Sequence, residues 1–541
     1  MIPKETQSVF DVFLTACQSY GDRPMLNVMP STAELYGIEA GEISYSRAMA
    51  QVDMWTGKFA QAGIGTGMRV ALLLENRPQF FLIWLALNRL GASVVPINPD
   101  LRAAELEYLI GHSEPALTIA IPSRVKELRK ATEAAGIEAG VMVPDGTVPT
   151  PRATAVVATP TRTEFDREAA VLYTSGTTGA PKGCVLANSY FLEVGRWYST
   201  LGGIVSLTTE GERMITPLPV FHMNAMSYSF MAMITVGGCL TALDRFHPRS
   251  WWQDVRDSGA TCLHYLGVMP SMLMGADPSP SDKDHSVRFG FGAGVDPNLH
   301  ADFEKRFGFP LVEGWAMTET GAGAVIANYT DDRVIGQAAL GRCPDNLEIM
   351  LADNEGNPVR EGEPGELLVR RKGKNPRLGF FTEYYRNPDA TAEAWKNGWF
   401  HTGDIVRKGA AGFFFFVDRK KNVIRRSGEN IAAVEVESIL MDHPDIIAAA
   451  VAPVPDAIRG DEVFACLNVA DPSPARAEEI INWALGQMAY YKVPGYIAFV
   501  DEIPLTATQK IQRAELKKLA QRLLDDPATI DTTGLKKRQV A

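Results

Sequence analysis

The stretch "RVALLLENRPQFFLIWLALNRLGASVVPINP", residues 69–99, sets the fold class of this chain. Arg69–Asn76 is a nearly uninterrupted apolar run whose length is typical of a buried strand. Arg77–Gly91 has the length of a helix that stops at its glycine, and Ala92–Pro99 is strand-like again. A strand, a helix and a second strand in this order predict a largely parallel sheet with helices on its faces.

The rest of the chain divides into regions of different texture. Its 541 residues exceed what one hydrophobic core normally holds, so two or more domains are expected. After about Asp353, turn residues alternate with short strands, which predicts a small antiparallel or barrel-like region. From Lys421 onward a compact α+β pattern begins. We place the boundary in the charged run Asp418–Asn422, giving a large α/β N-terminal domain (1–420) of parallel or mixed sheets flanked by helices, and a small α+β C-terminal domain (421–541).

Composition excludes several classes of protein. A net charge of −11 disfavours general nucleic-acid binding, because phosphate contacts need clustered Lys and Arg. The six cysteines form no C-x-x-C pair, so neither a zinc site nor a disulfide framework is indicated. The N-terminus lacks the apolar core of a signal peptide, and the apolar runs Phe80–Leu87 and Met231–Leu243 are too short to cross a bilayer. We expect a cytoplasmic enzyme without integral membrane association, and the sequence leaves homodimer formation open.

Tyr173–Gly183 reads "YTSGTTGAPKG" and combines glycines and hydroxyls with one lysine. Glycine lets the backbone approach a ligand closely, and hydroxyl and backbone N–H groups form anion-binding concavities. With Lys182 supplying positive charge, the segment predicts a phosphate loop; a plain surface hairpin is the weaker alternative. It departs from the P-loop pattern G-x-x-x-x-G-K-[ST], because two residues separate Gly179 from Lys182 and a glycine follows the lysine.

Seven motifs in consistent order resemble those of the adenylate-forming superfamily of acyl-CoA synthetases, luciferases and nonribosomal adenylation domains. They are YTSGTTGAPKG (173–183), PLPVFHMNA (217–225), FGAGV (291–295), EGWAMTETG (313–321), GWFHTGD (398–404), VDRKKNVIRRSGENI (417–431) and PLTATQKIQRAEL (504–516). The wording from GFFTEYYRNPDATAEAW (379–395) through SGENIAAVEVE (427–437) is most similar to the crotonobetaine/carnitine-CoA ligase group.

This resemblance implies a reaction with two halves. A carboxylate first attacks the α-phosphorus of ATP, giving acyl-AMP and pyrophosphate, while Mg²⁺ bridges phosphate oxygens. The thiol of coenzyme A then attacks the acyl carbonyl and releases AMP. The implied partners are therefore a small-molecule carboxylic acid, ATP and coenzyme A. Two alternatives stay open: transfer of the acyl group to a carrier protein, and a nucleotide-binding homologue without catalysis.

The same resemblance assigns the nucleotide site. The phosphate cradle is implied to comprise Thr174, Ser175, Gly176, Thr177, Thr178, Gly179 and Lys182. The nucleoside contacts are implied to come from Gly292, Ala293, Gly294, Glu313, Gly314, Trp315, Asp404 and Arg419. Trp315 replaces the family's usual Tyr and would stack on adenine, and Asp404 would accept both ribose hydroxyls. Thr318 would reach the α-phosphate and Glu319 would ligate the metal; with Lys182 they belong to the implied catalytic group.

Lys510 is the principal catalytic residue that the resemblance implies. Its ammonium would stabilise the negative charge that develops between the carboxylate and the α-phosphate. Gln509, just before it, stands where the family usually has glycine. A mobile C-terminal domain is then implied to rotate about a hinge at Lys421, which removes Lys510 from the site. The residues implied to enter on the coenzyme A side are Arg426, Ser427 and Gly428.

The acyl pocket is implied to comprise His222, Asn224, Gly267, Gly292, Ala316 and Met317. His222 stands where amino-acid adenylation domains carry the Asp that binds the α-ammonium, so an α-amino acid is not expected. Ala316 replaces the glycine of most CoA ligases and is far smaller than the Trp of acetate-selective members. His264 and Tyr265 add polarity nearby. We therefore expect a somewhat shallow pocket for a short, medium or small functionalised acid.

Overall fold

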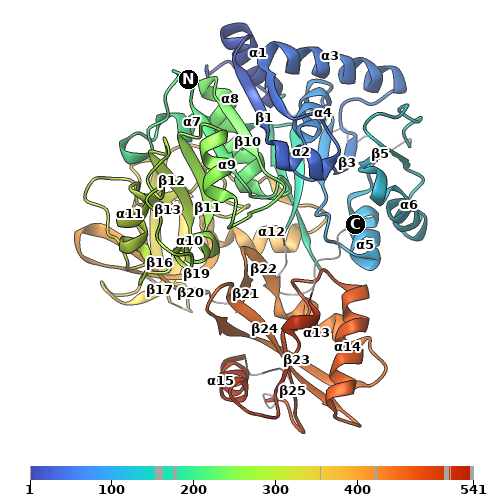
Figure 1. Cartoon of the computed structure of the whole chain (residues 1–541), viewed down its shortest axis with the longest axis vertical. Helices are drawn as coiled ribbons and strands as arrows, with labels where there is room; N and C mark the ends of the chain where they lie inside the picture. The colour runs from blue at the N-terminus through green and yellow to red at the C-terminus, as the bar shows by residue number, and fades with distance from the viewer. Residues whose placement is uncertain are drawn as a thin grey trace.

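A computed structural model describes residues 2–152, 163–174, 180–353, 355–419, 423–504, 511 and 513–536. A large N-terminal part, coloured blue to gold in Figure 1, lies above a smaller C-terminal part in orange and red. In the described ranges, strands form three sheets in the first part and one in the second. The molecule is therefore a mixed α/β protein, as the sequence predicts.

The predicted strand–helix–strand unit is present near the start of one sheet. Strand β3 (Arg69–Leu73), helix α4 (Pro78–Arg89) and strand β4 (Ser93–Pro96) follow one another, and the two strands pair in parallel. The helix ends two residues before Gly91, whose backbone adopts φ +74°. The remaining strands of this sheet are β18 (Glu383–Tyr384), β8 (Lys182–Ala187), β7 (Glu168–Thr174), β5 (Leu117–Ala120) and β6 (Gly140–Met142).

A second, mostly parallel sheet carries the strands that end at the site. Its order is β14 (Ile326–Ala327), β13 (Leu311–Trp315), β12 (Phe289–Ala293), β11 (Cys262–Leu266), β9 (Arg213–Thr216), β10 (Cys239–Ala242), β1 (Pro24–Val28) and β2 (Gly41–Ser44). Strands β9, β11, β12 and β13 run parallel to one another, so their carboxyl ends open on the same edge. Ligands gather at such edges of α/β sheets.

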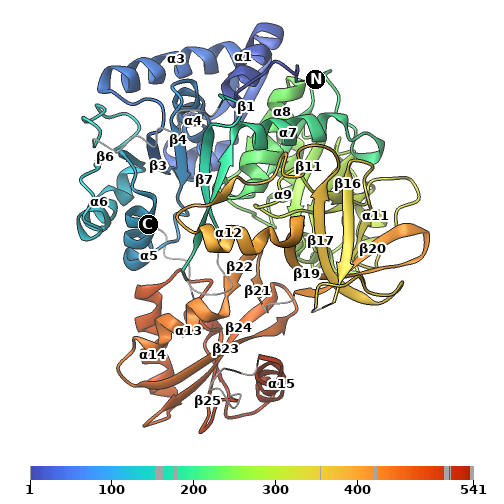
Figure 2. The same ribbon diagram turned by 180° about the vertical axis from the view of Figure 1, so that it is seen from behind.

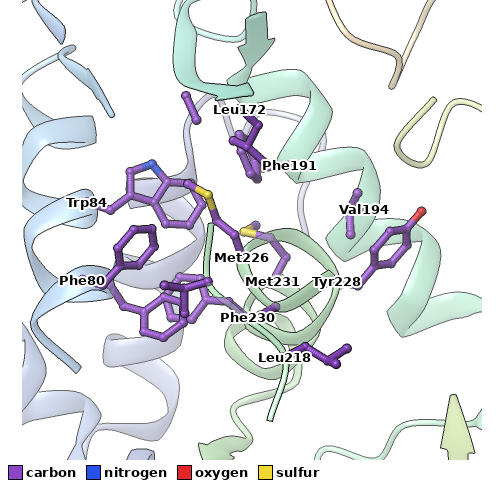
Figure 3. Packing of buried hydrophobic residues seen from close by; sticks show 14 of the residues in the cluster. Phe80, Trp84, Leu172, Phe191, Val194, Leu218, Met226, Tyr228, Phe230 and Met231 are labelled. Carbon is purple, nitrogen blue, oxygen red and sulfur yellow. The ribbon is translucent and has the colours of Figure 1, made fainter. Parts of the chain in front are cut away.

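Helices cover these two sheets and join them through one hydrophobic core. The helices of this part are α1 (Val9–Tyr20), α2 (Pro30–Tyr36), α3 (Tyr45–Ala62), α4, α5 (Ala103–Ser113), α6 (Val125–Ala134), α7 (Asn188–Thr200), α8 (Phe230–Val236), α9 (Trp251–Asp257), α10 (Val268–Met274), α11 (His300–Phe307) and α12 (Pro388–Ala394). In Figure 3, Phe80 and Trp84 of α4 face Met226, Phe230 and Met231. Phe81 stacks on Phe230 with ring centroids 4.4 Å apart. This packing anchors the π-helical turn η3 (Asn224–Ser229), which precedes α8.

The region predicted to be antiparallel or barrel-like is an antiparallel sheet. It comprises β15 (Ala339–Arg342), β20 (Phe413–Arg419), β19 (Phe400–Lys408), β17 (Pro364–Arg371) and β16 (Leu347–Ala352). The sheet begins before Asp353, earlier than the pattern of turns suggested. From behind, β7 runs down toward the junction between the two parts, with α12 beside it (Figure 2).

The C-terminal part has its own sheet and its own buried clusters. Its elements are β21 (Val423–Arg426), β22 (Glu429–Ala432), α13 (Ala433–Met441), β23 (Ile446–Asp456), β24 (Gly460–Val469), α14 (Pro474–Gln487), β25 (Tyr496–Phe499), α15 (Arg513–Leu524) and β26 (Ile530–Asp531). The proposed domain boundary falls at 420–422, outside the described residues. Among the described helices, none combines the length and apolarity needed to span a bilayer.

Candidate functional site

A cavity of about 1030 Å³ opens at the carboxyl ends of β11, β12 and β13. Its walls come from both parts of the molecule. The N-terminal part contributes Thr174, Lys182 and Trp315, among others, and the C-terminal part contributes Gly428 and Lys492. Several of the predicted phosphate, nucleoside and acyl residues therefore share one space with the turn between β21 and β22, whereas Asp404 is not among the described residues that line it.

The predicted phosphate loop is described only at its two ends. Thr174 and Lys182 pair across β7 and β8, so the loop joins two neighbouring antiparallel strands, and both residues line the cavity. Ser175–Gly179 lie outside the described residues. The Lys182 ammonium nitrogen lies 4.8 Å from the centroid of the Tyr384 ring, within cation–π range.

Tyr384 links this lysine to the predicted metal carboxylate. Its hydroxyl donates to Glu319 Oε1 at 2.8 Å, and Glu319 is buried at the cavity wall. Burial and then the Glu319 charge raise the pKa of Tyr384 well above its usual range, so the phenol stays a donor. Strand β18 places Tyr384 opposite Cys184 in β8. Sequence reasoning missed Tyr384, although it lies in the quoted segment 379–395, because no motif chemistry marks one tyrosine of that aromatic run.

The carboxylate of Glu319 suits a magnesium ion carried by substrate phosphates. Within the described residues, no group of three His, Cys, Asp or Glu side chains converges on one point. Mg²⁺ usually binds through one or two carboxylates together with substrate phosphates and waters. A single carboxylate beside a phosphate loop therefore fits that mode of binding, and Tyr384 fixes one of its oxygens.

Trp315 and Asp404, both predicted to contact the nucleoside, lie against each other. The indole N–H donates to Asp404 Oδ2 at 2.8 Å, and both side chains are buried. The sequence predicted separate contacts of these residues with adenine and ribose. The structure adds that they bind each other, so Trp315 also orients the carboxylate expected at the ribose. Arg419 pairs with Asp404 across β19 and β20, but its side chain lies outside the described atoms.

The glycines predicted to lie beside adenine make close contacts between strands. A Cβ on Gly292 would lie 2.2 Å from the Tyr265 carbonyl oxygen, and one on Gly314 would lie 2.6 Å from the Phe291 ring. Gly292, Ala293 and Gly314 line the cavity, whereas Gly294 bends the chain away at φ +78°.

Glu313 is turned toward backbone rather than toward the cavity. Its Oε1 accepts from the Val295 N–H at 3.3 Å, and burial raises the pKa of its carboxyl group. Glu313 is not among the described residues that line the cavity. Its contact with the nucleoside stays a prediction, and the hydrogen bond from the Val295 N–H instead ties Glu313 to the segment that follows β12.

Most of the predicted acyl residues line the cavity: His222, Asn224, Gly292, Ala316 and Met317. Gly267 does not, because it packs on the backbone of Gly294, where an added Cβ would lie 1.7 Å from the carbonyl oxygen. His222 Nε2 lies 3.3 Å from Glu429 Oε2, so β22 of the C-terminal part reaches the acyl side.

Asn224 belongs to a polar cluster that extends from the cavity into the core and also contains Ser229, His264 and Tyr198. His264 Nδ1 is 2.7 Å from Asn224 Oδ1 and 2.8 Å from Ser229 Oγ, and Nε2 is 3.0 Å from the Tyr198 hydroxyl. Burial lowers the pKa of His264 to about 3, so the ring is neutral. The sequence suggested polarity from His264, but Tyr198 and Ser229 were missed because both belong to helical runs with an ordinary core pattern.

The predicted coenzyme A residues separate into two groups. Ser427 and Gly428 form the turn between β21 and β22 with φ +51° and +88°. This turn touches β11, since an added Cβ on Gly428 would lie 2.2 Å from Leu266. Arg426 is instead buried, and its Nε donates to Glu462 Oε2 at 2.8 Å inside the C-terminal sheet. The predicted hinge Lys421 and catalytic Lys510 lie outside the described residues.

A second buried cluster, composed of Lys492, Glu105, Glu435, Tyr491 and Asn98, joins the two parts of the molecule. The Lys492 ammonium lies 2.6 Å from Glu105 in α5 and 2.8 Å from Glu435 in α13. Asn98 Nδ2 donates to the Tyr491 hydroxyl at 2.9 Å beside it. Burial opposes the charge on Lys492, but the two carboxylates outweigh it and raise its pKa above the usual value. Nothing in the sequence motifs pointed to this cluster.

Comparisons with known proteins agree with the resemblance carried by the sequence motifs. The sequence pattern of the AMP-binding enzyme family matches residues 13–381, and that of the AMP-binding enzyme C-terminal domain matches 435–510. A crotonobetaine/carnitine–CoA ligase from Salmonella agona is 30% identical over 491 residues, covering 88% of this chain and 93% of the relative. One from Shigella sonnei is 31% identical over 490 residues with the same coverage.

Solved structures share the fold over almost the whole chain. A malonyl-CoA ligase with methylmalonyl-CoA and AMP bound is 25% identical, with a TM-score of 0.73 over 89% of this chain and 97% of that one. An amide bond synthetase from Marinactinospora thermotolerans is 24% identical, with a TM-score of 0.78 over 94% and 99% of the two chains. At that lower identity the likeness concerns the fold alone.

Proposed function

Because the chain belongs to the family of AMP-binding enzymes, we propose a specific division of labour within its cavity. The chain is an AMP-forming acid–CoA ligase that uses a carboxylic acid, ATP and coenzyme A, as its curated relatives are CoA ligases over most of its length. The acid is a short, medium or small functionalised one, because Ala316 narrows the acyl wall only slightly. The assignments of individual residues follow from the contacts around the cavity.

The adenylation half of the reaction uses residues on or next to β8, β13 and β18. Lys182 and Thr174 hold the terminal phosphates at the ends of their strands, and Thr318 reaches the α-phosphate from the wall. Glu319 holds the magnesium ion, which when bound neutralises phosphate charge. Tyr384 keeps the Glu319 carboxylate oriented. Asp404, positioned by the Trp315 N–H, receives the ribose.

The thioester half uses the arrangement that the structure describes. The turn Ser427–Gly428 reaches β11 at the cavity, and glycine there leaves a narrow path for the thin arm of coenzyme A. This contact is the observation that carries the proposal, because it unites a C-terminal turn with the nucleotide and acyl walls. Lys510 acts in the other half and stabilises the adenylation transition state.

The test separates the two halves of the reaction. Lys510→Met should lower pyrophosphate release by on the order of 10²–10³-fold, while thioester formation from supplied acyl-AMP should persist. Gly428→Leu should give the opposite result, because the side chain blocks the path at Leu266. Pyrophosphate release is measured with and without coenzyme A, and acyl-CoA is measured by chromatography. Normal adenylation by the Lys510 variant, or AMP release that never yields acyl-CoA, would refute the assignment.

A further inference from the structure

We propose that Asn224 selects acids whose acyl part carries a hydrogen-bond acceptor, and that buried His264 fixes the direction of the Asn224 amide. The inference rests on the proposed function, because it places the acyl group at this wall of the cavity. It concerns a choice among acids that the family resemblance leaves open. Its evidence is a chain of hydrogen bonds that runs from the core to the cavity.

The neighbours of His264 determine where its single proton lies. A neutral imidazole has one N–H and one acceptor nitrogen. Asn224 Oδ1 can only accept, so the proton sits on Nδ1, 2.7 Å away. Nε2 then accepts from the Tyr198 hydroxyl at 3.0 Å, and the two rings lie nearly parallel with centroids 5.6 Å apart. The ring has no exposed surface, so this arrangement is rigid.

These hydrogen bonds determine which end of the Asn224 amide is turned toward the cavity. Because Oδ1 is held by His264, the NH₂ group is directed away from the histidine. Among the described residues, Asn224 Nδ2 makes no hydrogen bond, while Asn224 itself lines the cavity. Asn224 opens the π-helical turn η3, and such turns are frequent at functional sites. The wall therefore presents a fixed donor with two N–H groups.

Apolar side chains line the same cavity as this donor, together with the polar His222. Met223, Leu266 and Phe291 line the same space, and the hydroxyl of Tyr228 is already used by the Gly321 carbonyl at 3.0 Å. An unsubstituted acyl chain would displace water from the Asn224 amide and leave its N–H groups unpaired, which is costly. An acid with a hydroxyl or carbonyl oxygen would replace that water. Sites built in this way discriminate strongly against the analogue that lacks the polar group.

The test compares matched acids that differ by one oxygen: butanoate with 3-hydroxybutanoate, and pentanoate with 4-oxopentanoate. In the full-length enzyme, pyrophosphate release gives kcat/KM for each acid. We expect the oxygenated member of at least one pair to be favoured by about tenfold or more. Asn224→Leu should bring the ratio of kcat/KM values within each pair close to one, because the donor that distinguishes the two acids is lost.

The positioning role of His264 is tested through the same ratio. Tyr198→Phe removes the hydroxyl that donates to Nε2 of His264 and should reduce the preference by a few-fold, with Tm recorded for each variant. His264→Leu should abolish the preference, and His264→Gln, which can still donate to Asn224, should restore part of it. A merely structural role would lower kcat/KM for both acids of a pair equally.

The outcomes separate this inference from the function on which it rests. The inference alone would be overturned if Asn224→Leu and the wild type released pyrophosphate from plain and oxygenated acids in the same ratio. A wild-type preference for the plain member of every pair would overturn it as well. Failure of every acid to release pyrophosphate would overturn the proposed function, and the inference with it.

Discussion

Two buried polar clusters face the same cavity and meet the cost of burial in different ways. The cluster around His264 lies inside the N-terminal part and contains no charge, because burial lowers the pKa of the imidazole to about 3. The cluster around Lys492 spans both parts and keeps its charges, because two carboxylates surround one ammonium. A neutral network is suited to a part of the cavity wall that does not move. Charged groups, in contrast, can be solvated by water if the two parts of the molecule separate.

The difference follows from what each cluster has to do. His264 donates and accepts within one rigid core, so its geometry does not depend on where the C-terminal part lies. Lys492 and Glu435 belong to the C-terminal part, and Glu105 belongs to the N-terminal part. Rotation of the C-terminal part would break the Lys492–Glu105 contact and the Asn98–Tyr491 hydrogen bond but not the Lys492–Glu435 contact. Water would then solvate Glu105, so the ion pair is compatible with reversible opening.

The largest expected effect comes from breaking the charged cluster. Lys492→Met leaves Glu105 and Glu435 buried without their cation, and loss of one partner of a buried pair typically costs about 3–5 kcal/mol. Urea denaturation should show this loss in the free energy of unfolding. Lys518→Met is the matched control, since it removes an exposed contact with Glu515 and should change little.

A double-variant cycle tests whether the cost arises from the contact between the two parts. Lys492→Met and Glu105→Gln should be strongly non-additive, because both remove the same 2.6 Å contact. Additive effects would mean that Lys492 stabilises only its own part of the chain, and the comparison with His264 would lose its basis.

An intermediate effect is expected from pH acting on the neutral cluster. The folded-state pKa of His264, about 3, lies below the unfolded value near 6.5, so the unfolded chain binds the extra proton between these values. The stabilising contribution is therefore present above pH 6.5 and is lost as pH falls toward 3, by about 1.4 kcal/mol per pH unit. The destabilisation caused by His264→Gln should shrink by this amount as urea denaturation is repeated at lower pH. Parallel pH curves for wild type and variant would contradict the assignment of a neutral ring.

The smallest effect is expected where the two parts meet at a partly exposed contact. His222 and Glu429 lie 3.3 Å apart, and the histidine side chain is 40% exposed. Glu429→Gln should change the free energy of unfolding by less than about 1 kcal/mol. Glu429 lines the cavity from β22, which belongs to the C-terminal part. The substitution should therefore lower thioester formation from acyl-AMP more than pyrophosphate release. Equal losses in both half-reactions would show that the contact does not depend on the position of the C-terminal part.

Local sequence was sufficient for elements whose signal lies within one segment. The strand β3 and the helix α4 follow from short apolar runs of strand length and of helix length, and each element is buried along nearly all of its residues. The chemistry of the motifs was equally local: glycines, hydroxyls and one lysine in eleven residues indicate phosphate binding wherever the loop lies.

Pairings between distant residues required the folded chain. Trp315 binds Asp404 across 89 positions, Tyr384 binds Glu319 across 65, and Lys492 binds Glu105 across 387. No spacing rule connects such residues, because their distance depends on which strands are neighbours and how the two parts pack. The chain's composition and motifs thus settled the kind of chemistry, while the packing of sheets chose the partners that orient it, since hydrogen bonds and ion pairs depend on positions in space rather than on order along the chain.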